Sequence, residues 1–170
     1  IWRFNGTCYV DLLNPKVTDA FIESTYEAYK RVCGEDFGGV VPGIFTDEPA
    51  YTMRYDSTSW FIPWTGDLPR VFMEWNGYNI REHLPSLFFD VGDFHKVRFD
   101  FYRTVTRMFV ENYSKRIFDW CERNNLLYTG HYMAEDTLQS QIDWIGAAMP
   151  HYEYMHIPGM DHLGRNIYCL

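Results

Sequence analysis

Two glutamates follow apolar runs of the sequence and are of the residue type that does general acid–base chemistry. Glu48 comes after the run 40–45, and Glu135 comes after the run 126–133. Two carboxyl groups about 5 to 9.5 Å apart can cleave a glycosidic bond, because one protonates the leaving oxygen while the other activates water or attacks carbon. Apolar neighbours favour a protonated Glu48, and the backbone amides of a helix start favour an ionised Glu135. We therefore predict Glu48 as the general acid and Glu135 as the general base.

A simpler interpretation of both glutamates is structural. The triplet Asp-Glu-Pro after a strand often forms a turn with a helix cap. A glutamate just before a helix can likewise be a solvated acid of the first turn. On residue types alone, the catalytic and the structural interpretations both stay open.

Five further residues are of types that bind sugars. Aromatic faces stack on sugar rings, and a few polar side chains fix the hydroxyl groups. The alternative role for a tryptophan is to pack its segment onto the domain. The predicted substrate-binding residues are Asp47, Trp64, His131, Asp161 and His162.

Histidines, acidic residues and cysteines show no metal-binding pattern. His131, His156 and Asp161 form the basis of another hypothesis, a metal-dependent hydrolase, but their spacing matches no H-E-x-x-H motif. The four cysteines are far apart and include no C-x-x-C pair, which argues against a zinc knuckle. No EF-hand-type calcium loop occurs. We therefore name no metal ligand and no certain cofactor.

Alternating helices and strands must position these residues. Helical spacing of apolar residues predicts three helices, over 14–34, 93–124 and 137–149. Short apolar runs predict about four strands, near 8–12, 40–45, 126–133 and 153–157, of which 40–45 is typical of a strand buried on both faces. Residues 50–91 are rich in Tyr, Trp, Pro and Gly, with one weakly helical patch near 68–74. A connection of this length predicts a functional, lid-like insertion.

This order of elements predicts an α/β fold with parallel strands and flanking helices. A full TIM barrel needs about 250 residues, so a chain of 170 residues fits a single domain, 1–170, that is part of such a barrel. No G-x-G-x-x-G turn favours a doubly wound sheet instead. The end strands of a partial barrel lack partners, so we expect the chain to pair with the rest of the barrel or with another copy.

Composition narrows the classes of ligand. A formal net charge of -8 makes a phosphate-binding surface for nucleic acid unfavourable, and no apolar run approaches the length of a membrane span. The aromatic content of 19% leaves rings for a neutral, partly apolar ligand, which predicts a carbohydrate substrate. No basic segment followed by an apolar stretch marks an export signal, so the residues leave the compartment open.

Six short blocks of the sequence resemble one glycosidase family. They are VDLLNP at 10–15, PGIFTDEP at 42–49, PWT at 63–65, GY at 77–78, GHYMAE at 130–135 and IPGMDHL at 157–163. In this order they resemble the α-L-rhamnosidase-like barrels of glycoside hydrolase family 106. The blocks span nearly the whole chain but only the middle portion of such a barrel.

The resemblance implies a bacterial glycoside hydrolase that acts on a rhamnoside of a polysaccharide, with Glu48 matching the family's acid and Glu135 its base. It implies inverting hydrolysis, allows for assistance by calcium, and favours a periplasmic or secreted location. The remaining strands and accessory domains of these enzymes have no counterpart in the sequence, so the isolated chain is expected to have little activity. The alternative is a catalytically inactive carbohydrate-binding barrel fragment.

Overall fold

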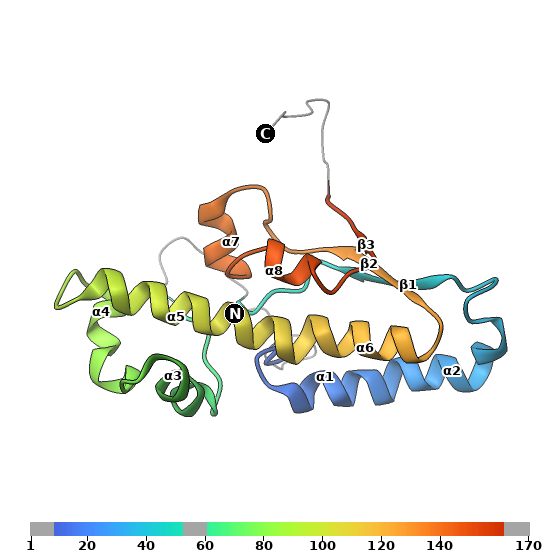
Figure 1. Cartoon of the computed structure of the whole chain (residues 1–170), viewed down its shortest axis with the longest axis horizontal. Coiled ribbons are helices and arrows are strands. Elements are labelled where there is room, and N and C mark those ends of the chain that lie inside the picture. The colour runs from blue at the N-terminus through green and yellow to red at the C-terminus, as the bar shows by residue number, and fades with distance from the viewer. Residues whose placement is uncertain (1–8, 53–60, 162–170) are drawn as a thin grey trace.

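A three-stranded parallel sheet joins one strand from the first third of the chain to two strands from its last third. The computed structural model describes residues 9–52 and 61–161. The strands are β1 (Gly43–Asp47), β2 (Leu127–His131) and β3 (Ile157–Pro158), and they lie side by side in chain order (Figure 1). Gly43 pairs with Leu127 and Asp47 with His131, so β1 and β2 begin and end together. This confirms an α/β fold with parallel strands, but the three strands do not close a barrel.

The predicted strand near 8–12 is wrong for the residues that the structure describes. Residues 9–11 carry no strand, and Leu12 and Leu13 form the turn before the first helix. Both leucines are buried in the core, which explains their apolar character without a strand. The helix predicted over 14–34 is present as the first helical rod. It comprises α1 (Pro15–Phe21), the π-helical turn η1 (Ile22–Tyr26) and α2 (Glu27–Cys33), followed by the short η2 (Gly34–Asp36).

The second helical rod is the longest element of the molecule and is also as predicted. It comprises α5 (Phe94–Phe109), the π-helical turn η4 (Val110–Ser114) and α6 (Lys115–Arg123), which run across Figure 1 without a break. The spacing of apolar residues predicted continuous helices and neither of the π-helical turns, η1 and η4, which are single turns within otherwise α-helical rods. None of the helices among residues 9–52 and 61–161 combines the length and apolar character that a membrane span requires.

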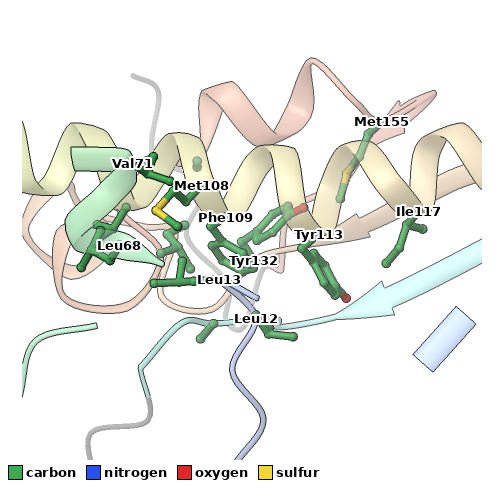
Figure 2. Packing of buried hydrophobic residues seen from close by; sticks show 14 of the residues in the cluster. Leu12, Leu13, Leu68, Val71, Met108, Phe109, Tyr113, Ile117, Tyr132 and Met155 are labelled. Atoms are coloured by element: carbon green, nitrogen blue, oxygen red, sulfur yellow. The ribbon is translucent and has the colours of Figure 1, made fainter. Parts of the chain in front are cut away.

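Phe109, at the end of α5, lies in the middle of the core. In Figure 2 it is surrounded by side chains from three other parts of the chain, among them Leu13, Leu68 and Tyr132. Its ring centroid is 4.6 Å from that of His151 and 6.1 Å from that of Tyr132. The core therefore joins the second helical rod to the segment that follows β2.

Residues 61–91 contain more helix than we predicted. They fold into α3 (Leu68–Asn76), η3 (Ile80–His83) and α4 (Leu84–Phe88), and both α3 and α4 contact α5. Leu68 and Phe72 are fully buried, which gives α3 an apolar face toward α5. The lid interpretation of residues 50–91 stays a prediction, and residues 53–60 lie outside the described part of the chain.

The carboxyl-terminal elements are shorter than predicted. The expected helix over 137–149 divides into α7 (Leu138–Trp144) and α8 (Met149–Tyr152). Pro150 lies in the first turn of α8, where its missing N–H costs no hydrogen bond, so this proline begins a helix rather than ending one. The expected strand over 153–157 is limited to Ile157–Pro158.

One face of the sheet is covered by helices and the other is open in the described residues. Thr46 and Tyr128 are buried on the covered face, whereas Phe45 is 60% exposed. Leu127 and Ile157 are exposed as well. The run 40–45, which leads into β1, was predicted to be a strand buried on both faces. That prediction is wrong for the described chain.

His151 is fully buried and makes folding sensitive to acid. Burial lowers the pKa of His151 to about 3, from an ordinary value of 6.5. The unfolded chain therefore binds this proton between about pH 6.5 and 3 while the folded chain does not, so acid favours unfolding. We expect this one group to lower the unfolding free energy by about 1.4 kcal/mol for each pH unit in that window.

Urea unfolding of the wild-type chain and His151→Gln between pH 7 and 4 measures this contribution. The variant is expected to be less stable at pH 7 and to lose less stability with falling pH. Identical pH slopes for both proteins would show that His151 does not resist protonation.

Candidate functional site

Glu48 and Glu135 both follow carboxyl ends of neighbouring parallel strands. Asp47 and His131 are the last register pair of β1 and β2, and Glu48 comes one residue after this pair. Glu135 comes four residues after it, in the turn that precedes α7. The parallel pairing therefore brings both predicted catalytic residues to the same edge of the sheet.

The backbone is left-handed at both of these chain segments. Glu48 has a φ of 47° and Ala134, directly before Glu135, has a φ of 52°. A non-glycine residue in this region costs about 1–3 kcal/mol, and such residues cluster at functional sites. Asn125 is also left-handed, but it follows the end of α6, where helices often end in this way. The strain at Glu48 and Ala134 has no such capping role.

Three donors hold the carboxylate of Glu135. Oε2 accepts hydrogen bonds from the backbone N–H of Tyr132, at 3.1 Å, and from the hydroxyl of Tyr152. Oε1 accepts one from the backbone N–H of Asp161, at 2.9 Å. The two backbone N–H groups can only donate, so each oxygen of Glu135 accepts at least one hydrogen bond, which suits a carboxylate.

The amides that hold Glu135 are not those of a helix start, contrary to our expectation. Thr137 is the N-cap of α7, and its side chain and that of Ser140 form a capping box. Glu135 lies outside this cap, and its carboxylate turns back toward the end of β2 and the residues after β3. The turn after β2, rather than the dipole of α7, therefore orients the predicted base.

Asp47 and His131 form a pair on the open face of the sheet. His131 Nε2 lies 3.1 Å from Asp47 Oδ1, and the ring of Phe45 packs edge-on against the imidazole. His131 Nδ1 is buried and has no hydrogen-bond partner among the described residues. The structure thus brings together two of the predicted substrate-binding residues, next to the strand ends that lead to the glutamates.

The strands approach each other closely at this edge. A Cβ added to Gly130, whose φ is +148°, would lie 2.2 Å from the carbonyl oxygen of Thr46. A Cβ added to Gly159 would lie 2.6 Å from the carbonyl oxygen of Gly130. Only glycine fits at these two positions, so they fix the spacing of the backbone beside Asp47 and His131.

The other predicted site residues are not gathered into the same cluster by side-chain contacts of the described residues. Trp64 is 39% exposed and stands between buried Pro63 and Thr65. Asp161 is exposed and touches Glu135 through its backbone N–H rather than its carboxylate. His162 lies outside the described residues. The sugar-binding roles of all three stay predictions.

The donor set of the described residues does not fit a metal ion. No group of three or more His, Cys, Asp or Glu side chains converges within residues 9–52 and 61–161. Both ring nitrogens of His156 are occupied, because Nδ1 accepts from the N–H of Tyr128 and Nε2 bonds Glu122. His156 therefore does not join His131 and Asp161 in a metal site, and no step through calcium or another metal follows from these residues.

A buried hydroxyl network, which no motif of the sequence predicts, supports the strand ends. The Thr46 hydroxyl lies 3.1 Å from that of Tyr128, which in turn is hydrogen-bonded to Tyr132. Ser114, in the turn η4, lies 2.6 Å from the Tyr132 hydroxyl and 2.7 Å from His151 Nδ1. Burial raises the pKa values of both tyrosines, so their hydroxyls stay protonated. The apolar pattern that marks these positions as core contained no signal of this network.

A large cavity lies apart from the glutamates, between α5, α7 and α8. Its volume is about 950 Å³, and among the residues lining it are Phe99, Tyr102, Arg103, Ile142 and Tyr154. Neither Glu48 nor Glu135 is among the described residues that line it. The cavity is therefore separate from the candidate site at the sheet edge.

Comparisons with known proteins bear on the fold. The sequence matches no protein-family model, and it matches no curated protein. Among solved structures it is similar to a rhamnosidase from Novosphingobium sp. PP1Y, with a TM-score of 0.63 and 16% sequence identity. The match covers 86% of this chain and 13% of the rhamnosidase chain. At this identity the likeness concerns architecture, so the chain folds like a portion of that rhamnosidase.

Proposed function

We propose that this chain carries the catalytic edge of a glycoside hydrolase, with Glu48 as general acid and Glu135 as general base. The observation that carries the proposal is the pairing of β1 and β2, which ends both strands at the same edge, one residue before Glu48 and four residues before Glu135. The fold likeness to a rhamnosidase supports it and makes an α-L-rhamnoside the first substrate to test.

The proposed chemistry is an inverting hydrolysis. Glu48 gives its proton to the glycosidic oxygen as the bond from that oxygen to the anomeric carbon breaks. Glu135 takes a proton from a water molecule whose oxygen bonds to the anomeric carbon from the opposite face. Asp47 and His131, paired beside the strand ends, are proposed to bind sugar hydroxyls together with Trp64, Asp161 and His162.

Hydrolysis of nitrophenyl glycosides tests this function directly. We expect release of nitrophenol from the α-L-rhamnoside, and proton NMR of the freshly released sugar should show the inverted anomer. A matched panel of β-glucoside, β-galactoside and α-mannoside defines the specificity. The assay is run on the chain and on the longest natural protein that contains it, and absence of turnover in both would remove the proposal.

A catalytically inactive sugar-binding domain is the second candidate. The observation that favours it is the set of three donors on the Glu135 carboxylate. These hydrogen bonds connect the segment after β2 to α8 and to the residues after β3, which also suits a purely structural role. Calorimetric titration with rhamnose and rhamnosides separates the two candidates. Binding without turnover supports the inactive domain, whereas turnover supports the hydrolase.

The open face of the sheet is proposed to contact further polypeptide. Parallel sheets are normally covered on both faces, and Phe45, Leu127 and Ile157 are exposed on this one. We propose that the remaining strands of a barrel cover this face in a longer protein, and that a second copy covers it when the chain is alone.

Sedimentation velocity at micromolar concentrations measures the association of the isolated chain. We expect self-association that Phe45→Ser weakens and that Val32→Ser, at an exposed position on α2, leaves unchanged. A monomeric chain that melts cooperatively would contradict this expectation.

A further inference from the structure

Tyr152 donates its hydroxyl to one oxygen of Glu135, and no sequence motif pointed to it. The tyrosine is the last residue of α8, a helix that follows α7 in the chain and is not part of the β1–β2 pair. Burial, and then the hydrogen bond to Glu135, raise the pKa of Tyr152 well above its ordinary value. The hydroxyl therefore keeps its proton at all working pH values and remains a donor to Glu135.

The residue is held in place by the buried network. Its neighbour His151 is bonded to Ser114, and the ring of Tyr152 packs edge-on against that of Tyr132. Tyr132 in turn donates its backbone N–H to the same oxygen of Glu135 that Tyr152 contacts. Both donors to this oxygen are therefore fixed by groups from η4 and α8, so the direction of the carboxylate is set by the core.

We infer that Tyr152 is a positioning residue for Glu135, which keeps one carboxylate oxygen engaged and leaves the other to face the reacting water. This inference rests on the proposed function of Glu135 as the base. Oε1 has a single donor, the N–H of Asp161, and so retains lone-pair capacity for a water molecule. Oε2 accepts two hydrogen bonds, so both of its lone pairs are engaged.

The contact can be tested without any activity by a double-mutant cycle in urea unfolding. Tyr152→Phe and Glu135→Ala are made singly and together, and Tyr154→Phe is the matched control, from a ring that packs against Phe118. We expect coupling between positions 152 and 135 that changes the unfolding constant about tenfold. If the effects of the two single substitutions on the unfolding constant multiply, to within about twofold, to the effect of the double substitution, the inference is overturned. The control pair, Tyr154→Phe with Glu135→Ala, is expected to show such independent effects.

The pH dependence of hydrolysis distinguishes positioning from a purely structural role. In a protein that hydrolyses the rhamnoside, Tyr152→Phe is expected to lower kcat about tenfold with KM within twofold, and to move the acidic limb of the kcat/KM profile to higher pH. The limb moves up because a carboxylate that loses a donor is less stabilised in its charged form. An unmoved limb together with a lower melting temperature would overturn the positioning role.

The two tests separate this inference from the proposed function. If Glu135→Gln hydrolyses normally, the proposed function fails, and the cycle alone decides whether Tyr152 positions the carboxylate. If Glu135→Gln is inactive while the cycle shows no coupling, the hydrolase proposal stands and the inference about Tyr152 is overturned.

Discussion

Glu135→Gln and Glu48→Gln are each expected to lower kcat for rhamnoside hydrolysis by about two to four orders of magnitude. General acid–base catalysis contributes about 10²–10⁴-fold to rate, and an amide neither donates the acid's proton nor accepts one as a base. Initial rates with saturating nitrophenyl rhamnoside measure the loss. The acid and the base differ in one respect, since a nitrophenolate leaves readily and needs less protonation. Glu48→Gln should therefore lose more activity with a disaccharide than with the nitrophenyl substrate.

Asp136→Asn is the control for the predicted base. Asp136 is exposed, directly follows Glu135, and contacts Ser140 in the cap of α7. We expect it to keep hydrolysis within about twofold. Melting temperatures must accompany the rates, because Gln at position 135 loses at least one of the three hydrogen bonds of the carboxylate. Normal hydrolysis by folded Glu48→Gln and Glu135→Gln would remove both residues from the chemistry.

Phe109→Ala is expected to lower the unfolding free energy by about 3–5 kcal/mol. Phe109 is fully buried, and its ring packs against those of Tyr132 and His151. This contact joins the second helical rod to the buried hydroxyl network behind the candidate site. Loss of a buried phenylalanine removes its transfer free energy and leaves a cavity, since the neighbouring rings relax only partly. This is a large fraction of the 5–15 kcal/mol that stabilises an ordinary domain. Urea unfolding at pH 7 measures the loss.

Phe99→Ala is the matched control on the same helix. Phe99 is 63% exposed and contacts Arg103 through a cation–π interaction, so its loss should cost less than about 1 kcal/mol. Equal losses at positions 99 and 109 would show that the region around Phe109 is not the packing centre of the fold.

Local sequence patterns predicted the long elements well. The spacing of apolar residues between Asn14 and Gly34, and between Asp93 and Asn124, corresponds to the two helical rods, because one face of each rod is buried over many turns. The short elements were less predictable. The strand expected near 8–12 is a buried turn, and the strand expected over 153–157 keeps two residues, since short apolar runs do not reveal which partner they pack against.

The position of the two glutamates after neighbouring strands was predictable, but their surroundings were not. The sequence predicted parallel βα units, and the pairing of Asp47 with His131 confirms that their strand ends coincide. Two of the three donors on Glu135 come from Tyr152 and Asp161, 17 and 26 residues away along the chain. No local pattern encodes such contacts. The resemblance to an α-L-rhamnosidase family agrees with the fold likeness, although no family model matches the sequence.

By itself the sequence determined the alternation of helices and strands, the direction of the strands, and which residues follow the strand ends, because these depend on periodicity and chain direction. The tertiary structure alone decided that Glu135 is held by Tyr132, Tyr152 and Asp161, and that Asp47 meets His131. The contacts of Glu135 depend on the position of α8, and of the residues after β3, beside the turn after β2. Packing of the whole core sets these positions, so they have no signature in any short stretch of residues.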